Sequence, residues 1–355
     1  MRTETRNKFN QYLAQQAKLN HIGSAAQKFN VEPTIQQRLE TAMQESSAFL
    51  SRINMLGVTE QSGASVMLGV GSTIASRTDT TKARRNTRDV ASLSSDDYTC
   101  KKTDYDTHVT YALLDAWAKF PDFQARLSNA IVQRQALDRI MVGWHGTQAA
   151  ADTDREKNPL LQDVNIGWLQ KYRSKASDRV LDSGDKKSGN ILLGDGGDYA
   201  NLDALVYDAV QMLDPWYRKS PDLVAIIDRN LIHSKMLAAI ERGAASNREE
   251  LAADEIITRT HIGGLPYVDV PHFPDGVVMV TSLKNLSIYW QEGARRRLIR
   301  EEPEWDRIAT YESSNDAYVI EDFGLGAVVE NIQRMDQLDD NGEASAGEAT
   351  TEQGA

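Results

Sequence analysis

The residues that could do chemistry in this chain form short patterns, and each pattern lacks a part that its chemistry needs. GVGSTI at 69–74 begins like a dinucleotide-binding fingerprint, but Ile74 replaces the third glycine and no crossover helix follows, which favours a turn in a hairpin. Asp195 and Asp198 in GDGGD could bind calcium, yet the acidic spacing of a helix–loop–helix site is missing, which favours a solvated loop. The sequence has no GxxxxGKS/T loop, GxSxG elbow, HExxH motif or paired CxxC. We therefore expect no catalytic site, no metal and no cofactor.

The single cysteine and the scattered histidines indicate no site either. Cys100 has no partner for an internal disulfide, and the polar start MRTETRNKFN lacks the apolar core of a secretory signal, so synthesis in a reducing cytoplasm is expected. His145 is expected at a helix end, whereas His261 and His272 flank turns. No apolar run approaches the roughly 20 residues that span a bilayer, so we expect no membrane contact.

Charge is unevenly distributed along the 355 residues, whose net charge is −11. That balance opposes wrapping nucleic acid, because phosphate binding relies on Lys and Arg. The segment after Arg334 contains three Asp, three Glu and no base, whereas residues 1–29 carry a net charge of +4. The bases of residues 1–29, set against Glu4, are Arg2, Arg6, Lys8, Lys18 and Lys28.

Two further charged segments are candidates for contacts between subunits. The basic segment at 82–88 lacks interleaved aromatic residues and has three interpretations: a solvated loop, donors of intersubunit ion pairs, or a nucleic-acid contact. RRRLIREEPEWDR at 295–307 places arginines beside acids, and exposed pairs of this kind contribute at most about 1 kcal/mol each, so they favour specificity over stability. The candidate contact residues are Lys82, Arg84, Arg85, Arg88, Arg295, Arg296, Arg297, Glu301 and Glu302.

Helices are predicted first near the N-terminus. An amphipathic helix is expected over 2–20 and a second over 34–50, with a linker at 29–32 because Pro33 favours extended geometry in the residue before it. The longest helix is predicted from Pro121 to Trp144, with its apolar residues close to one face. Further helices are predicted over 158–173, 199–213 and 231–241, and a loop over 182–198.

Strands are predicted in most of the remaining segments. Short strands at 53–58 and 66–70 suggest a hairpin around 61–63, and a second hairpin is expected around Gly263-Gly264. Further strands are predicted at 223–227, 277–280, 286–290, 296–300, 308–312, 317–322 and 327–332. This mixed order predicts an α+β fold rather than a regular βαβ repeat.

Two stretches are too polar to build a core of their own. The stretch from Thr59 to His108 contains few large apolar residues. Because a two-stranded ribbon is at best marginally stable in water, this stretch is either disordered or laid against something else. The acidic tail beyond Met335 is expected to be disordered.

Five strings, in this order, resemble the peduovirus-type (P-two-like) major capsid proteins of tailed bacteriophages. They are MQESSAFLSRIN at 43–54, NPLLQDVNIGWLQKYR at 158–173, GGDYANLDALV at 196–206, NLSIYWQEGARRRLIREEPEWDRI at 285–308 and AYVIEDFG at 317–324. The resemblance covers nearly the whole chain and departs from the family in the 175–195 loop and the acidic tail.

The resemblance implies the Hong Kong-97 phage capsid fold and a structural subunit that self-assembles into the icosahedral head shell. The polar ribbon would be covered by a neighbouring subunit, and heterologous contacts would close rings of five and six copies. The implied parts are an N-terminal segment (1–30), an N-terminal arm (31–52), an extended loop (53–110), a peripheral domain (111–157 and 285–333), an axial domain (158–284) and a disordered tail (334–355).

The resemblance also implies partners and processing. A maturation protease would remove the N-terminal scaffold-like segment, and we expect the cut near Phe29 or Asn30. Losing residues that carry +4 takes the formal charge from −11 to −15, which weakens attraction between the shell wall and DNA. The other implied partners are an internal scaffold, a portal at one vertex, and enclosed double-stranded DNA without sequence-specific binding.

The residues alone leave two other classes of protein open. An α/β enzyme would carry its site in the 182–198 loop and would need a compact, convergent polar pocket. A scaffolding or adaptor protein of the virion would be more helical and less rich in strands.

Overall fold

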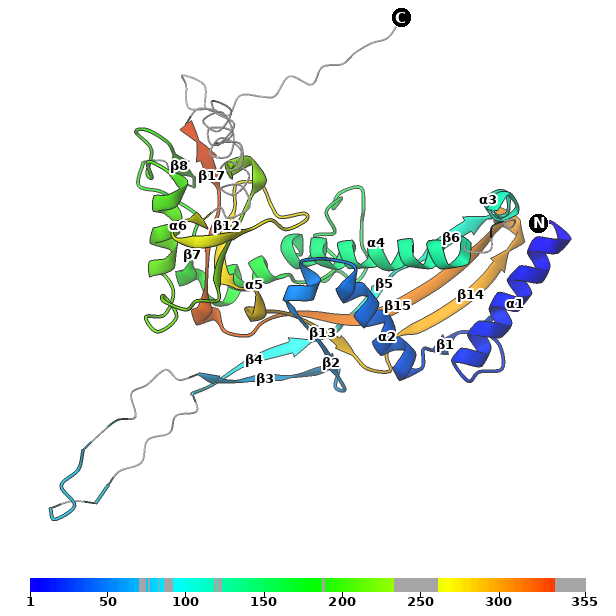
Figure 1. Ribbon diagram of the computed structural model, residues 1–355, viewed down its shortest axis with the longest axis horizontal. Coiled ribbons are helices and arrows are strands. Elements are labelled where there is room, and N and C mark those ends of the chain that lie inside the picture. The colour runs from blue at the N-terminus through cyan, green and yellow to red at the C-terminus, as the bar shows by residue number, and fades with distance from the viewer. Residues whose placement is uncertain are drawn as a thin grey trace, which may run out of the picture. The chain divides into compact units, whose positions relative to one another are not determined.

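The structure is a computed structural model that describes residues 1–69, 75, 77–82, 84–85, 92–117, 120, 123–186, 189–232 and 261–335. The chain forms two compact units, each made of two stretches of sequence. Unit 1 comprises Met1–Lys171 and Lys284–Asp322, and unit 2 comprises Tyr172–Leu283 and Phe323–Ala355. Both units mix helices with strands, as the α+β prediction requires (Figure 1).

Unit 1 is built on a sheet whose longest strand is β15, which has 14 residues. β14 and β13 pair antiparallel with successive halves of β15, and β6 and β5 also pair along it. β1 extends the sheet beyond β14, and β2 lies parallel to β13. The strands are β1 (Phe29–Asn30), β2 (Asn54–Val58), β5 (Lys101–Asp104), β6 (Thr107–Thr110), β13 (Leu286–Gln291), β14 (Arg296–Glu302) and β15 (Arg307–Ile320).

The helices of unit 1 follow the predicted pattern closely. α1 spans Thr3–Leu19, and α2 spans Pro33–Glu45, where the Glu32 carboxylate accepts the Thr34 N–H at 2.8 Å and caps the helix. α4 (Phe123–His145) is the long helix expected to end near Trp144, and residues 121–122 lie outside the described part. The remaining helical segments of unit 1 are η1 (Leu50–Arg52), α3 (Tyr111–Trp117), η3 (Leu283–Asn285, at the boundary) and η4 (Pro303–Trp305).

An aromatic cluster forms the core of unit 1 where α4 meets the sheet. The rings of Trp144 and Trp168 have centroids 4.9 Å apart, and Phe49 lies 5.5 Å from Trp144. Tyr318 on β15 contacts Trp168 edge to face at 5.4 Å. Gly143 permits this packing, because a side-chain Cβ there would overlap the Trp168 ring.

The polar stretch forms a two-stranded ribbon made of β3 (Ser62–Gly69) and β4 (Ser92–Thr99). These strands pair antiparallel with each other (Figure 1), and Tyr98 anchors the base by packing against Tyr289 with ring centroids 5.1 Å apart. The hairpin predicted between 53–58 and 66–70 is wrong, because the partner of β2 is β13 and that of β3 is β4. Most of the turn expected at 69–74 lies outside the described residues.

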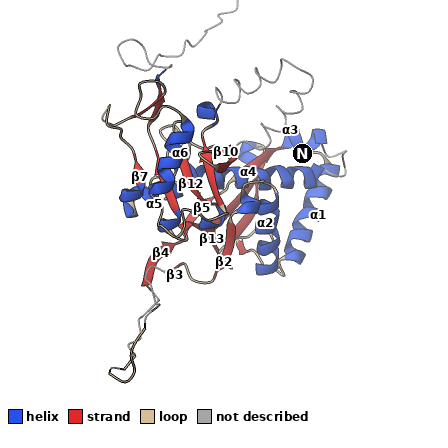
Figure 2. Ribbon diagram, turned by 60° about the vertical axis from the view of Figure 1, so that its left-hand side comes forward, coloured by secondary structure: helices blue, strands red, loops and turns tan. Residues whose placement is uncertain are grey.

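Unit 2 is a six-stranded mixed sheet packed against α6 (Leu202–Gln211), as Figure 2 also shows. The predicted hairpin at Gly263-Gly264 is confirmed, and both glycines have positive φ angles, of 60° and 84°. The sheet order is β10 (His261–Ile262), β11 (Leu265–Val268), β9 (Leu223–Ile227), β12 (Val278–Ser282), β16 (Gly326–Val329) and β7 (Val180–Leu181), while β8 (Ile191–Leu193) pairs separately with β17 (Ile332–Arg334).

Several predicted boundaries differ from the structure. The helix expected over 158–173 is α5 (Trp168–Lys175), and turns precede it. The 182–198 loop contains β8, and the strands expected at 308–312 and 317–322 are one strand, β15. Residues 158–171 group with unit 1, because Trp168 packs in its core, and 323–333 group with unit 2, because β16 pairs with β12. The helix expected at 231–241 and the acidic tail lie mostly outside the described residues.

Candidate assembly surfaces

The N-terminal segment, residues 1–30, lies on a surface of unit 1 that we call the seat. The seat consists of β14, the part of β15 beside it, and α3 (Figure 1). Its floor is apolar: Ile299 and Ile308 are buried beside Ala25 and Phe29 of the segment. The other apolar side chains packed against this cluster include Phe9, Tyr12, Leu13 and Ile22 of the segment and Tyr111 and Leu114 of the seat.

Two carboxylates of the seat bind polar groups of the N-terminal segment. The Arg6 guanidinium donates to both oxygens of Glu301, with Nη2–Oε1 at 2.7 Å, and the Tyr111 hydroxyl donates to the same carboxylate at 2.6 Å. These donors hold the pKa of Glu301 below its ordinary value. Asp115 accepts the Thr5 hydroxyl at 2.6 Å and the Arg2 N–H at 2.9 Å.

The expected cleavage region is part of a sheet. Phe29 and Asn30 form β1, which pairs antiparallel with Arg297 and Arg296 of β14. The next residue, Val31, donates its N–H to the Arg295 carbonyl at 2.8 Å. Phe29 is only 8% exposed. The backbone around Phe29 is therefore extended but paired with β14, so a protease must first free it from the sheet.

Arg295, expected on an intersubunit surface, is completely buried inside its own subunit. Its guanidinium donates to Glu40 of α2 at 2.9 Å, to Gln135 of α4 at 2.7 Å and to Glu312 of β15 at 2.6 Å. Such a charge is stable only where carboxylates surround it, and here its partners fix α2 to β15 and α4. The prediction of an intersubunit contact for Arg295 is thus corrected.

A second buried arginine joins the same network from α4. Arg139 pairs with Asp316 at 2.9 Å and also with Glu40. Burial alone would raise the pKa of Glu312, but the guanidinium groups of Arg295 and Arg297 outweigh it and hold that pKa below its ordinary value. No signal in the sequence revealed these groups, because the burial of the polar residues Gln36 and Glu40 beside Met43 on α2 is seen only in the structure.

The other candidates of the 295–307 segment take different positions. Arg296 is exposed. Arg297 is partly buried and pairs with Glu312 at 2.8 Å. Glu302 is buried and pairs with Arg307 at 2.7 Å. Of the candidate pairs, therefore, most are made within the subunit, and Arg296 is left facing solvent.

The basic candidates in the ribbon are exposed where the structure describes them. Lys82 pairs with Asp79, three residues earlier, at 3.5 Å, and both side chains are largely exposed. Arg84 and Arg85 are exposed, and Arg88 lies outside the described residues. The ribbon thus presents positive charge to solvent in the isolated subunit.

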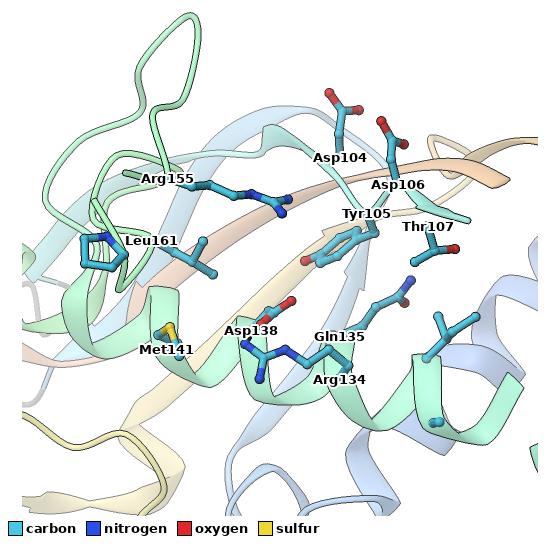
Figure 3. A pocket seen from close by; sticks show the side chains of 13 residues that line it. Asp104, Tyr105, Asp106, Thr107, Arg134, Gln135, Asp138, Met141, Arg155 and Leu161 are labelled. Carbon is cyan, nitrogen blue, oxygen red and sulfur yellow. Dashed lines mark ion pairs between the residues drawn. The ribbon is translucent and has the colours of Figure 1, made fainter. Parts of the chain in front are cut away.

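Two cavities have walls in which polar groups are paired within the subunit. A cavity of about 480 Å³ lies between α4, the β5–β6 turn and the 155–161 loop, where Arg134 and Asp138 form an ion pair and the Tyr105 ring points inward (Figure 3). A second cavity, of about 750 Å³, touches the 193–195 part of the predicted loop, and the carboxylate of Asp203 in its wall accepts the Gly263 N–H at 2.9 Å.

Asp198 of the 182–198 loop holds backbone groups of its own loop. Asp198 accepts the N–H groups of Leu192 at 2.8 Å and Lys186 at 2.9 Å, and these bonds lower its pKa. Within the part of the chain that the structure describes, no three His, Cys, Asp or Glu side chains are placed to hold a metal ion. No described helix is long and apolar enough to cross a membrane.

Comparison with solved structures defines the class of protein. The chain aligns with a chain of a satellite phage P4 procapsid, a structure that includes a size determination (Sid) protein, with 44% identity and a TM-score of 0.77 over 94% of this chain and 99% of that one. It also aligns with the capsid of an empty GTA particle at 16% identity and a TM-score of 0.50, over 81% of this chain and 90% of that one, which shows the fold alone. The fold is the Hong Kong-97 capsid fold.

Sequence comparison then gives the family. The phage major capsid protein family of the P2 type matches residues 8–332. The chain is 46% identical to the capsid protein of Escherichia phage P2, over 94% of this chain and 96% of that one, and 42% identical to the major capsid protein of Serratia phage KSP20, over 94% and 97%. The chain belongs to the P2 family of phage major capsid proteins. It is a structural, non-enzymatic component of the virion that self-assembles into the head shell.

Proposed function

We propose that the chain enters assembly as a precursor whose N-terminal segment occupies the seat until a maturation protease removes it near Phe29 or Asn30. The observation that carries this proposal is the mode of attachment. The segment is a basic helix tied to the seat by Arg6 and by short polar contacts to Asp115, and a single short strand connects it to α2. An element attached in this way can leave without unfolding the aromatic core.

The ribbon is the element that joins subunits. Within the described residues β3 and β4 pair only with each other, and the ribbon has its aromatic anchor at the base. A neighbouring subunit covers the ribbon in the shell, and obligate interfaces of this kind bury roughly 2,000 to 5,000 Å². We assign the peripheral role to unit 1 and the axial role to unit 2, whose copies surround the axes of pentamers and hexamers.

The partners follow from the same assembly route. An internal scaffold takes part in building the precursor shell, and a portal occupies one vertex. Removing residues 1–29 takes +4 from the subunit and leaves a net charge of −15. A more negative wall attracts packaged double-stranded DNA less, so the shell encloses the genome without binding particular sequences.

The processing proposal is tested by intact-mass measurement of subunits from unprocessed precursor shells and from mature particles. We expect the full-length mass in precursor shells and a mass lacking residues 1–29 or 1–30 in mature ones. A full-length mass in mature particles would overturn the proposal. The exact mass difference also identifies the bond that is cut.

A further inference from the structure

Unit 2 exposes aromatic rings and positive charge along the C-terminal half of α6 and just beyond it. Trp216 and Tyr207 are 51% and 64% exposed, and the Trp216 ring lies against Tyr217 with centroids 5.9 Å apart. Exposed apolar groups that gather in one place mark interaction surfaces, whereas single ones do not. We call this surface, which consists of Tyr207, Gln211, Trp216, Tyr217, Arg218 and Lys219, the α6 patch.

Hydrogen bonds hold the α6 patch together without neutralising its charge. Tyr207 and Gln211 lie four residues apart on one face of α6. The Arg218 guanidinium donates to the Gln211 amide oxygen at 3.3 Å and to the Leu213 carbonyl at 2.8 Å, and both acceptors are uncharged. Lys219 is exposed. Among the described residues, neither base forms an ion pair with a carboxylate.

The carboxylates of the same region have other partners. Asp208 accepts the Tyr199 hydroxyl at 2.6 Å, and Asp214 pairs with Arg179 at 2.6 Å. The bases of the α6 patch are therefore available to a carboxylate from outside. The patch fits an acidic partner that also brings an apolar side chain to the exposed rings.

The segment after Met335 has this composition. Residues 336–355, which lie outside the described residues, contain three Asp, three Glu and no base. Leu338 is their only large apolar residue, and it stands between Asp336 and Asp340 in the string DQLDD. An apolar side chain flanked by carboxylates complements exposed rings flanked by bases.

The tail that fits the α6 patch comes from another copy, because each tail begins at the opposite end of α6. Met335, the last described residue, lines a cavity together with Asn201 and Asp203 at the start of α6. The 10 residues of α6 span about 15 Å, and Trp216 lies beyond its far end. Leu338 follows Met335 by three residues, which extend over about 10 Å. The tail is thus too short to place Leu338 on Trp216 of its own copy.

We propose that the acidic tail of one copy docks on the α6 patch of the next copy, with Leu338 against Trp216 and the flanking carboxylates beside Arg218 and Lys219. This inference rests on the proposed arrangement of unit 2 around the axes of pentamers and hexamers. The contact joins the start of α6 in one copy to the far end of α6 in the next, so it uses two different surfaces. Such heterologous contacts repeat head to tail and close into rings.

The test is carbodiimide cross-linking of closed shells that are assembled from equal amounts of ordinary and isotopically heavy full-length chains. Carbodiimide joins a carboxylate directly to a lysine amine, so only groups in contact react. Trypsin releases residues 335–355 as one peptide, because no Lys or Arg follows Arg334. We expect this peptide to be linked to the peptide that contains Lys219, with light and heavy partners combined as often as random assembly requires.

Two variants that keep every reactive group test the apolar part of the contact. Leu338→Ser and Trp216→Ala should each lower the yield of the link about fivefold, because each removes one side of the contact. The double variant should lower it no further than either single variant, since both remove the same contact. Lys219→Arg should abolish the link, because arginine keeps the charge but does not react. Leu160→Ser, which changes an exposed apolar residue of unit 1, is the matched control and should leave the yield unchanged.

Three outcomes would overturn the inference. The first is a link that joins only light to light and heavy to heavy peptides, because the tail then binds its own copy. The second is equal linking of the tail to Lys219 and to the exposed Lys157 of unit 1, which indicates random encounters. The third is the absence of any link to Lys219. Electron microscopy of the same shells separates these failures from a failure of the axial role: unit 2 around the axes leaves that role standing, whereas unit 2 away from them overturns both proposals.

Discussion

Arg6 and Glu301 form a two-point ion pair that joins residues 295 positions apart in the sequence. The pair fixes α1 to β14, and the Tyr111 hydroxyl of α3 completes the carboxylate's set of donors. Both charged side chains keep contact with solvent, with 42% and 26% exposure. The contact is thus strong enough to orient the N-terminal segment and accessible enough to open.

The first prediction concerns protection of the Phe29–Asn30 bond. Chymotrypsin should cut purified full-length subunits slowly after Phe29, because that residue is buried in β1. Arg6→Ala or Glu301→Gln should raise the rate about fivefold, since a partly exposed pair contributes about 1 kcal/mol. Mass spectrometry of the fragments measures the rate.

The control for this prediction is the exchanged pair Arg6→Glu with Glu301→Arg. It should restore part of the protection, although the Tyr111 hydrogen bond to the carboxylate is lost. Equal cutting of all variants would show that the ion pair does not hold the segment.

The second prediction is a pH dependence of the same docking. The pKa of Glu301 is lowered chiefly by the Arg6 hydrogen bond, so its contribution is fully present above the ordinary carboxyl value of 4.5 and is lost as the pH falls through the lowered value. Hydrogen exchange of peptides covering residues 22–32, corrected for intrinsic rates, should therefore accelerate in acid. Glu301→Gln should weaken this dependence without abolishing it, because the pKa of Asp115 is also lowered by the segment. An unchanged profile in Glu301→Gln would contradict the assignment.

The third prediction concerns the buried network. Glu40→Gln removes a carboxylate shared by Arg139 and Arg295, so it should destabilise the subunit by about 3–5 kcal/mol. Lys157→Ala, which breaks an exposed pair with Asp154, should cost at most about 1 kcal/mol. Chemical denaturation of purified subunits measures the free energy of unfolding of both variants. If Glu40→Gln lowered it no more than Lys157→Ala does, the buried network would not be what stabilises the subunit.

The fourth prediction concerns the close approach at Gly143. Gly143→Ala should destabilise the subunit by about 1–3 kcal/mol, because the added methyl group overlaps the Trp168 ring. Gly23→Ala, where nothing lies within 4 Å of the added Cβ, is the control for an open position. The midpoint of unfolding, followed by Trp fluorescence, should fall for Gly143→Ala and stay unchanged for the control variant.

Local chemistry made several elements predictable from sequence. Pro33 marked the start of α2, the apolar face from 121 to 144 marked α4, and Gly263-Gly264 marked a hairpin. Each of these signals acts within a few residues. Local patterns alone predicted only an α+β class. The resemblance to a known family predicted the fold as a whole.

Distant partners explain what the sequence did not reveal. β2 pairs with β13, whose residues lie more than two hundred positions away, so the hairpin predicted around 61–63 was wrong. Arg295 looked like a surface residue within a charged run, but it lies just before β14 and is completely buried, whereas Arg296, the first residue of that strand, is exposed. The seat was missed because Arg6, Asp115 and Glu301 come from three separate segments.

The most direct test of the central claim, that the shell is built by self-contact through the ribbon, is electron microscopy of a variant lacking residues 61–95, expressed with the phage scaffold. The deletion removes the outer pairs of the ribbon and interrupts the four pairs of Ser62–Ser65 with Asp96–Thr99, which also belong to the ribbon, so the subunit should stay folded and soluble, with a circular dichroism spectrum close to that of the full chain. The account predicts folded subunits that form no closed shells, whereas the full chain forms them under the same conditions. Normal closed shells from the deleted variant would contradict it.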